Sequence, residues 1–243
     1  MKINGFTQLI ILSALMLFVS CDAFKCIEGS GSIEQAYRGF SNFDGIKLEG
    51  SFDVIVEQNN NNEYSVEVEA DKNFLPYIST EVYSNILEIK TVNNRCLNGD
   101  RVTVYVKLPE LLYVQLTGSG YIEAKCYNLY NEKMTISNTG SGEISVLGIN
   151  CGETETFLSG SGIIKLSGVT SVHNVYLSGS GDISAFPLDT EESYAKMNGS
   201  GAMYLFAYKY MDAVITGSGN VFYQGNPELH FTITGSGNIV NRN

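Results

Sequence analysis

The chain has 243 residues, which is enough for one elongated domain or for two compact ones. It carries 26 Asp and Glu against 15 Lys and Arg, so its formal net charge is −11. The basic residues are sparse and scattered, which excludes the concentrated positive surface of a nucleic-acid-binding protein. The excess of acidic residues is typical of a solvated surface.

The N-terminal residues have the pattern of an export signal. Lys2 precedes an apolar run at 9–19. Eleven residues are too few to span a membrane as a helix, but they suit the apolar region of a signal peptide.

A cysteine follows this apolar run. Ser20 stands directly before Cys21, which resembles the lipobox of bacterial lipoproteins, although Phe18 replaces the usual Leu. We therefore predict a lipoprotein signal peptide at 1–20, an acylated Cys21 that anchors the chain to a membrane, and a linker at 21–35. The alternative is ordinary secretion, with Cys21 as a simple thiol.

Four further cysteines remain in the mature chain, at Cys26, Cys96, Cys126 and Cys151. An even number in an exported protein permits two disulfides, with three connectivities. Cys126 and Cys151 fall in adjacent repeats but three positions out of phase, so their pairing is one prediction and free buried thiols are the other. No Cys-x-x-Cys motif occurs, which disfavours zinc, and we predict no metal and no other cofactor.

The first half of the chain contains weak copies of a repeat. Gly-Ser corners at Ser30 and Ser51 are 21 residues apart, and apolar residues follow each corner at alternating positions. Alternation without a glycine corner predicts further strands at 64–68, 86–89 and 102–108. A loop tip is expected at 59–62 and a short helical turn at 71–77. We place a soft boundary between two β sub-domains near Pro109.

In the second half, the tripeptide Gly-Ser-Gly recurs seven times. Successive copies are 22, 20, 19, 20, 18 and 18 residues apart, and their serines are Ser119, Ser141, Ser161, Ser180, Ser200, Ser218 and Ser236. A fixed period near 20 predicts a solenoid in which each repeat forms one coil. Two residues after each second glycine stands an apolar residue: Ile122, Ile144, Ile164, Ile183, Met203, Val221 and Ile239.

This alternation on both sides of a glycine corner predicts a strand, a tight turn and a second strand, with the apolar side chains inward. Glycine at the corner allows a positive φ and a close approach of neighbouring backbones. The predicted fold is therefore all-β: a parallel β-helix, or β-solenoid, with about 18–22 residues per coil.

One stretch of aromatic residues is a candidate binding surface. Tyr204, Phe206, Tyr208 and Tyr210 alternate along the sequence, opposite in phase to Met203. If Met203 is buried, the four aromatic side chains form an exposed stripe that suits a glycan or protein ligand. The alternative is that a loop or a neighbouring subunit covers them.

Catalysis is the less favoured function. Parallel β-helices often carry polysaccharide-active enzymes, and the outward acids Glu143 and Asp182 occupy the same position two coils apart. At about 4.8 Å per coil they are roughly 10 Å apart, slightly beyond the separation used by inverting glycosidases. The Gly-Ser-Gly corners match neither a phosphate loop nor a nucleophile elbow. His173 and His230 are expected at the surface. We predict a non-enzyme, with a polysaccharide-active enzyme as the alternative.

Several segments together resemble a known bacterial family. They are Cys26-Ile27-Glu28-Gly29-Ser30-Gly31, FDGIKLEGSFDVIVEQ at 43–58, PELLYVQLTGSG at 109–120 and the serial Gly-Ser-Gly coils. These resemble the auto-transporter adhesin head GIN domain, which is common in Bacteroidetes.

The resemblance covers residues 36–243. It implies a right-handed β-solenoid, a cell-envelope setting and adhesion. Together with the predicted anchor, it leads us to expect a non-catalytic lipoprotein of the outer membrane that acts as an adhesin or as a binding or structural module, with a glycan or protein as the ligand. It supplies no catalytic residues.

Overall fold

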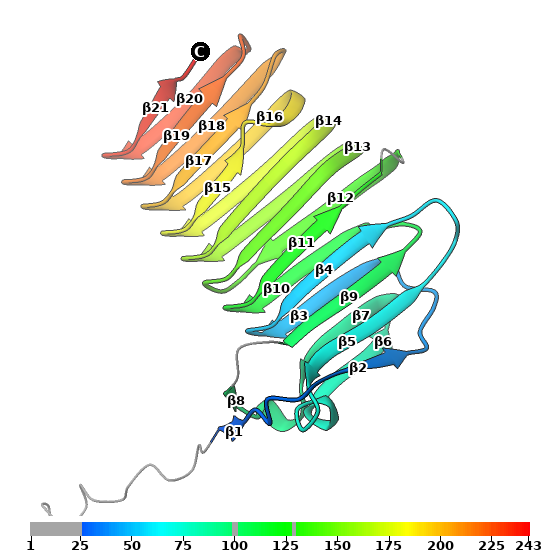
Figure 1. Ribbon diagram of the computed structural model, residues 1–243. Helices are drawn as coiled ribbons and strands as arrows, with labels where there is room; N and C mark the ends of the chain where they lie inside the picture. Colours follow the sequence, from blue (N-terminus) through cyan, green and yellow to red (C-terminus); the bar gives the residue numbers. More distant parts are fainter. Residues whose placement is uncertain (1–25, 99–101, 128–129) are drawn as a thin grey trace, which may run out of the picture.

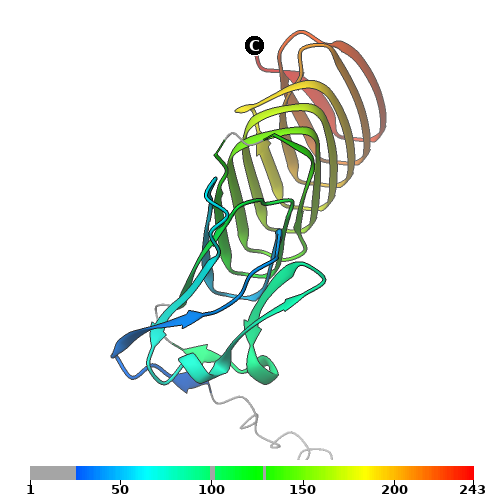
Figure 2. The ribbon, with the colours of Figure 1, turned by 90° about the vertical axis from the view of Figure 1, so that its right-hand side faces the viewer.

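The computed structural model describes residues 26–98, 102–127 and 130–243. These residues form an elongated stack of parallel β-coils, with residue 26 near one end and the C-terminus at the other (Figures 1 and 2). Nineteen of the described strands belong to one continuous sheet that bends at the corners. The predicted all-β parallel solenoid is confirmed.

Each coil contributes one strand before its corner and one after it. The strands before the corner stack as one long wall, the pre-corner face. In spatial order they are β7 (Ile86–Thr91), β3 (Gly45–Gly50), β10 (Tyr113–Gly118), β12 (Asn131–Asn138), the later parts of β13 (Glu143–Gly160) and β14 (Ile163–Gly179), β16 (Leu188–Gly199), β18 (Tyr210–Gly217) and β20 (Glu228–Gly235).

The strands after the corner form the opposite wall, the post-corner face. In spatial order they are β9 (Val102–Leu108), β4 (Asp53–Gln58), β11 (Tyr121–Lys125), the first parts of β13 and β14, β15 (Asp182–Ala185), β17 (Ala202–Phe206), β19 (Asn220–Gln224) and β21 (Asn238–Asn241). Apolar residues aligned from coil to coil fill the space between the two walls.

The register of the post-corner face explains this core. Ile122, Ile144, Ile164 and Ile183 are direct partners in neighbouring coils, and Met203 and Val221 continue the column. All six are fully buried. The inward column predicted from the repeat therefore forms, and it ends at the partly buried Ile239 in the last coil.

The order of coils in space differs from their order in the sequence at the N-terminal end. The coil of β3 and β4 lies between the β7–β9 coil and the β10–β11 coil, because β3 pairs in parallel with both β7 and β10. Strands on both sides of Pro109 belong to the same sheet, since β9 pairs with β4 and β10 with β3.

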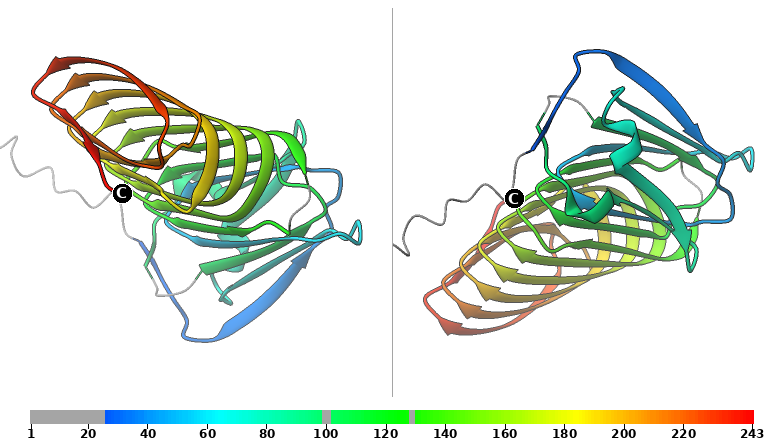
Figure 3. Two further views of the ribbon diagram at one scale, coloured as in Figure 1. Left: turned by 90° about the horizontal axis from the view of Figure 1, so that it is seen from above. Right: turned by 90° about the horizontal axis from the view of Figure 1, so that it is seen from below.

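A cap covers the N-terminal end of the stack (Figure 3). Its strands are antiparallel: β2 (Ile33–Arg38) pairs with β5 (Ser65–Asp71), β5 with β9, and β6 (Ile78–Tyr83) with β7. The 3₁₀ turns η2 (Leu75–Tyr77) and η3 (Val92–Asn94) and the short parallel pair β1 (Ile27–Glu28) and β8 (Leu97–Asn98) complete it. The helical turn expected at 71–77 corresponds to η2.

The Ser30 copy of the repeat belongs to this cap and makes no coil corner, which differs from the sequence interpretation. Gly31 N donates to Asp71 Oδ1 at 2.6 Å, and Ser30 N donates to Asn73 Oδ1 at 2.9 Å. The side chains of Asp71 and Asn73 therefore accept the N–H groups that, at the solenoid corners, donate to a backbone carbonyl of the neighbouring coil. The Ser51 copy is a true corner, since Gly50 pairs with Gly118 of the next coil.

The glycine corners stack through their backbones. At the corner of Gly179, the N–H groups of Ser180 and Gly181 both donate to the carbonyl oxygen of Gly160, at 2.9 and 3.0 Å. Gly179 has φ +132°, and a Cβ there would lie 2.4 Å from the Gly160 oxygen. Glycine is therefore required at this position for two reasons: the backbone has a positive φ, and the preceding coil occupies the space that a side chain would need.

Substitution of this glycine tests the stacking. We expect Gly179→Ala to lower the free energy of unfolding by at least about 2 kcal/mol, because it combines an unfavourable φ with a backbone clash. The matched control is Gly39→Ala, since a Cβ at Gly39 meets nothing within 4 Å. Urea unfolding monitored by circular dichroism measures both. Equal stabilities of the two variants would contradict the proposed role of the corner.

The core also contains buried polar residues, among them Thr154, Thr156 and His173, which we call the polar seam. His173 is buried, so the prediction that it lies at the surface is wrong. It faces inward because Thr154, its partner in the preceding coil, is itself buried. Its Nε2 lies 2.9 Å from Thr156 Oγ1. Burial lowers the pKa of His173 to about 3, so the native protein holds this side chain neutral.

This histidine predicts a pH dependence of stability. Between about pH 6.5 and pH 3 the unfolded chain binds a proton at His173 that the native protein does not bind. Acidification in this window therefore lowers the free energy of unfolding, by roughly 1.4 kcal/mol per pH unit. In His173→Gln that contribution is absent, so its urea midpoint should fall less steeply between pH 6 and pH 4. Parallel pH profiles for the two proteins would contradict the assignment.

Candidate functional site

The predicted aromatic stripe does not run along one strand. Tyr204 and Phe206 lie on β17, Tyr208 lies in the turn that follows, and Tyr210 begins β18. The chain changes walls at this turn, where the N–H of Tyr208 donates to the Thr190 carbonyl oxygen of the preceding coil. The four side chains are exposed or partly exposed, but they do not form a single row.

Aromatic contacts instead run across the coils. Tyr204 stacks on Phe222 of the next coil, with ring centroids 5.0 Å apart and ring planes 13° apart, and it meets Phe186 edge to face. The guanidinium carbon of Arg242 lies over the Phe222 ring, 4.8 Å from its centroid. Tyr204 and Phe222 are direct partners one coil period apart, whereas Phe186 lies two residues after Ser184, the direct partner of Tyr204. The stacked pair therefore follows the coil period and not the alternation along one segment.

A second aromatic column lies on the pre-corner face and borders a concavity. Phe157, Tyr176, Lys196 and Val214 are direct partners in four neighbouring coils. The rings of Phe157 and Tyr176 stack at 4.9 Å with planes 6° apart. The ammonium group of Lys196 lies 5.7 Å from the centroid of the Tyr176 ring.

A column of hydroxyl and amide groups runs parallel to these side chains. Its members stand two residues later in each coil, and they are Ser159, Ser178, Asn198 and Thr216. The two columns line a surface depression of about 370 Å³, which we call the aromatic groove. Rings beside hydrogen-bonding groups suit a ligand that has both apolar faces and hydroxyl groups.

Glu143 and Asp182, the two acids considered for catalysis, occupy equivalent positions two coils apart, as the sequence predicted. Ile163 of the intervening coil lies between them. Glu143 accepts an ion-paired hydrogen bond from Lys165 at 2.8 Å. Asp182 Oδ1 accepts the backbone N–H of Ala202 at 3.0 Å. Each carboxylate therefore binds a neighbouring coil, which is a structural use of both acids.

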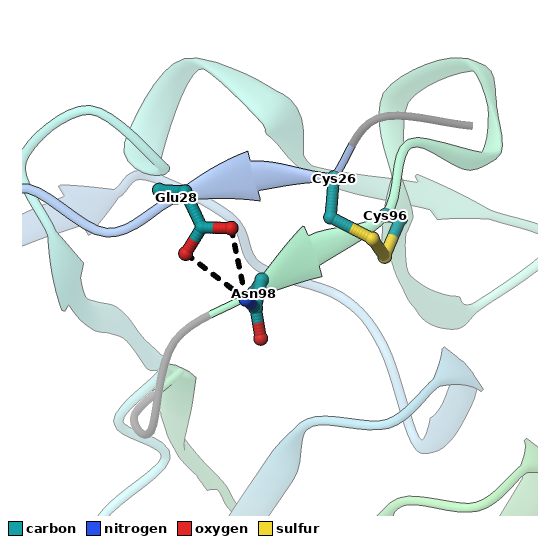
Figure 4. Close-up of a disulfide and its surroundings, with 4 residues drawn as sticks. All are labelled: Cys26, Glu28, Cys96 and Asn98. Carbon is teal, nitrogen blue, oxygen red and sulfur yellow. Dashed lines mark hydrogen bonds between the residues drawn. A yellow bond between two sulfur atoms is a disulfide. The ribbon is translucent and has the colours of Figure 1, made fainter. Parts of the chain in front are cut away.

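The cysteines divide into one disulfide and two thiols. Cys26 and Cys96 are bonded across 70 residues, with Cα atoms 4.6 Å apart, beside the β1–β8 pair. Asn98 Nδ2 donates to both carboxylate oxygens of Glu28 at 2.9 Å next to this bond (Figure 4). In a chain-entropy account, closing a loop of this length stabilises the fold by about 4 kcal/mol.

Cys126 and Cys151 are free thiols, so the considered pairing between them is not found. Cys151 is buried, and its Sγ lies 3.1 Å from Thr154 Oγ1 in the polar seam. Burial raises the pKa of Cys126 to about 12, which keeps this thiol protonated and unreactive. Cys21, the predicted lipid attachment site, lies outside the described residues.

Within residues 26–98, 102–127 and 130–243, no three His, Cys, Asp or Glu side chains are grouped so that they could hold a metal ion. Across the same ranges, no helix is both long and apolar enough to cross a membrane.

Three solved structures with this fold come from Bacteroides and Parabacteroides species. A "putative adhesin" from Bacteroides fragilis superposes with a TM-score of 0.84 at 20% identity, covering 89% of this chain and 100% of the other. A "putative lipid binding protein" from Parabacteroides distasonis has a TM-score of 0.73 at 25% identity, covering 90% and 100%. A "putative adhesin" from Parabacteroides merdae has a TM-score of 0.66 at 20% identity, covering 89% and 99%.

Sequence comparison assigns the family. No curated protein matches the chain. The model of the family described as "Putative auto-transporter adhesin, head GIN domain" matches residues 42–227, which is most of the chain. The resemblance seen in the sequence is confirmed, and the chain belongs to the head GIN domain family.

Proposed function

We propose that this protein is a lipid-anchored, non-catalytic adhesin of the bacterial outer membrane, and that its aromatic groove binds a glycan. The observation that carries the proposal is the groove itself, which places stacked rings beside a column of hydroxyl and amide groups. The family description and the adhesin-like neighbours support the same class of function.

The position of the predicted anchor supports a projecting role. Cys21 precedes Cys26 by five residues, and the Cys26–Cys96 disulfide ties the start of the fold to the cap. The cap and the C-terminus lie at opposite ends of the solenoid (Figure 1). A lipid at Cys21 therefore holds the cap near the membrane and directs the later coils, which carry the groove, away from it.

Two alternatives are weaker on chemical grounds. A polysaccharide-active enzyme needs free acids, whereas Glu143 and Asp182 each bind a neighbouring coil. One structural neighbour is described as a putative lipid binding protein. An acyl chain offers no hydrogen bonds to Ser178 or Asn198, whereas a glycan does, so the groove favours the glycan.

The anchor predicts a labelling pattern. Cells that express the protein and grow on a palmitate analogue should label the wild-type chain and the Cys126→Ala control, but not Cys21→Ala. Protease added to intact cells should remove the labelled protein, because an adhesin must face outward. Labelling of Cys21→Ala would contradict the acyl anchor, and protection from protease would contradict adhesion.

The groove predicts a loss of binding on truncation of its rings. On a glycan array the purified wild-type protein should bind, and Phe157→Ala/Tyr176→Ala should bind about tenfold or more weakly, which corresponds to about 1.4 kcal/mol. The matched control is Tyr204→Ala/Phe222→Ala, which removes a similarly stacked pair from the other wall.

The pattern of loss identifies the site. Loss in the control variant alone would move the site to the Tyr204 column and contradict the groove. Binding of the wild-type protein to lipid vesicles but to no glycan would replace the glycan with a lipid.

A further inference from the structure

A second concavity, of about 550 Å³, lies where the cap meets the first coils. It shares no lining residue with the aromatic groove. Its walls come from segments far apart in the sequence, including the ends of β4 and β9, the β4–β5 loop and the β6–β7 turn. We call it the junction pocket, and the lining side chains that matter are Asp44, Gln58, Asn62, Tyr64, Asn85 and Glu110.

Gln58 provides the main indication that this pocket binds a ligand. Its side chain is 0% exposed, and its Nε2 donates to the Pro109 carbonyl oxygen at 3.2 Å. Its Oε1 is buried and has no hydrogen-bond partner among the described residues. A buried acceptor left without a partner is unfavourable by about 1–3 kcal/mol. Because Oε1 is closed to solvent in this conformation, a ligand reaches it only after the Gln58 amide moves toward the pocket, and a hydrogen bond formed there would remove this cost.

The other polar groups define the chemistry of that molecule. Asp44 and Glu110 contribute two carboxylates, and none of the described residues that line the pocket is Lys, Arg or His. An anion is therefore disfavoured, and a ligand rich in hydrogen-bond donors is favoured. The side-chain amides of Asn62 and Asn85 both donate and accept, which matches hydroxyl groups that do the same.

An aromatic ring supplies an apolar surface in the same pocket. Tyr64 is partly exposed, and Phe43 holds its ring at a centroid distance of 5.1 Å and an angle of 57°. A sugar presents C–H groups to such a ring while its hydroxyls meet the polar wall. The volume lies within the range of small-molecule sites, roughly 300–1,000 Å³.

The backbone fixes the walls of the pocket before any ligand binds. The N–H groups of Asp44 and Gly45 donate to the Asn85 carbonyl oxygen at 2.9 and 3.1 Å, and the N–H of Leu112 donates to the Asp44 carbonyl oxygen at 2.8 Å. These bonds tie together three segments that are distant in the sequence. Such preorganisation lowers the entropy lost on binding.

We propose that the junction pocket binds a neutral mono- or disaccharide, with the carboxylates as surface acceptors, Tyr64 as the stacking ring and Gln58 Oε1 as a further acceptor once its amide moves toward the pocket. This site stands apart from the groove, and the inference goes beyond the proposed function because it does not require adhesion.

The test uses two asparagines whose backbones favour glycine. Asn62 and Asn85 have φ of 56° and 65°, a conformation that asparagine tolerates and glycine adopts freely. Asn62→Gly/Asn85→Gly therefore removes two amides without straining the backbone. The matched control is Asn93→Gly/Asn94→Gly, with φ of 53° and 52° outside the pocket.

Isothermal titration of the purified protein with glucose, galactose, N-acetylglucosamine, lactose and cellobiose measures the affinity. We expect at least one sugar to bind the wild type and the control equally, and to bind Asn62→Gly/Asn85→Gly at least tenfold more weakly. Gln58→Met, which removes the unpartnered oxygen, should also weaken binding, and its urea midpoint reports folding separately.

Three results would overturn the inference: no sugar binds, the variants bind like the control, or calcium chloride binds where sugars do not. Phe157→Ala/Tyr176→Ala should leave this binding unchanged. If that groove variant alone loses the sugar, the ligand belongs to the groove, and the junction pocket assignment fails while the proposed function stands.

Discussion

At most of the glycine corners of the solenoid, the carbonyl oxygen of one glycine accepts two N–H groups of the next corner, as Gly160 does from Ser180 and Gly181. This contact leaves no room for a Cβ on the first glycine of a corner, and at most corners that glycine also has a positive φ. Because it recurs from coil to coil, it fixes how far apart successive coils lie and which residues face each other. The rest of the structure depends on that registration.

The inward and outward columns follow from the same register. Facing inward, aligned Ile and Leu side chains build a core that no single coil could bury, since each repeat is too small to fold alone. Facing outward, side chains of neighbouring coils either form ion pairs, as the diagonal neighbours Glu143 and Lys165 do, or stack, as the direct partners Phe157 and Tyr176 do. A binding surface on such a scaffold is a column or a pair of columns, and the aromatic groove has that form.

The features that recur with the repeat period could be predicted from the sequence. The corners, the inward column from Ile122 to Val221 and the parallel solenoid all follow from residues that recur at one phase. Features without a period were not predictable. The Ser30 corner serves the cap because Asp71 and Asn73 happen to bind it. His173 looked like a surface residue because its partners, Thr154 and Thr156, are also polar, and a buried polar seam has no apolar signature.

The candidate sites were predictable to different degrees. The aromatic residues correctly suggested an exposed aromatic surface. The sequence predicted a row along the chain from Tyr204 to Tyr210, whereas in the structure aromatic rings stack between neighbouring coils, one repeat period apart. The junction pocket gave no sequence signal, because its residues come from segments joined only by the unexpected order of coils at the cap. The Cys26–Cys96 bond was one of several open pairings, which spacing alone cannot rank.

The central claim is that this protein binds a glycan and leaves it chemically unchanged. The most direct measurement is mass spectrometry of an oligosaccharide bound from a glycan array, after prolonged incubation with the protein. Our account predicts that all of the ligand is recovered at its original mass while it remains bound. Recovery of shortened or unsaturated fragments, abolished in Glu143→Gln/Asp182→Asn, would contradict it and make the protein a polysaccharide-active enzyme.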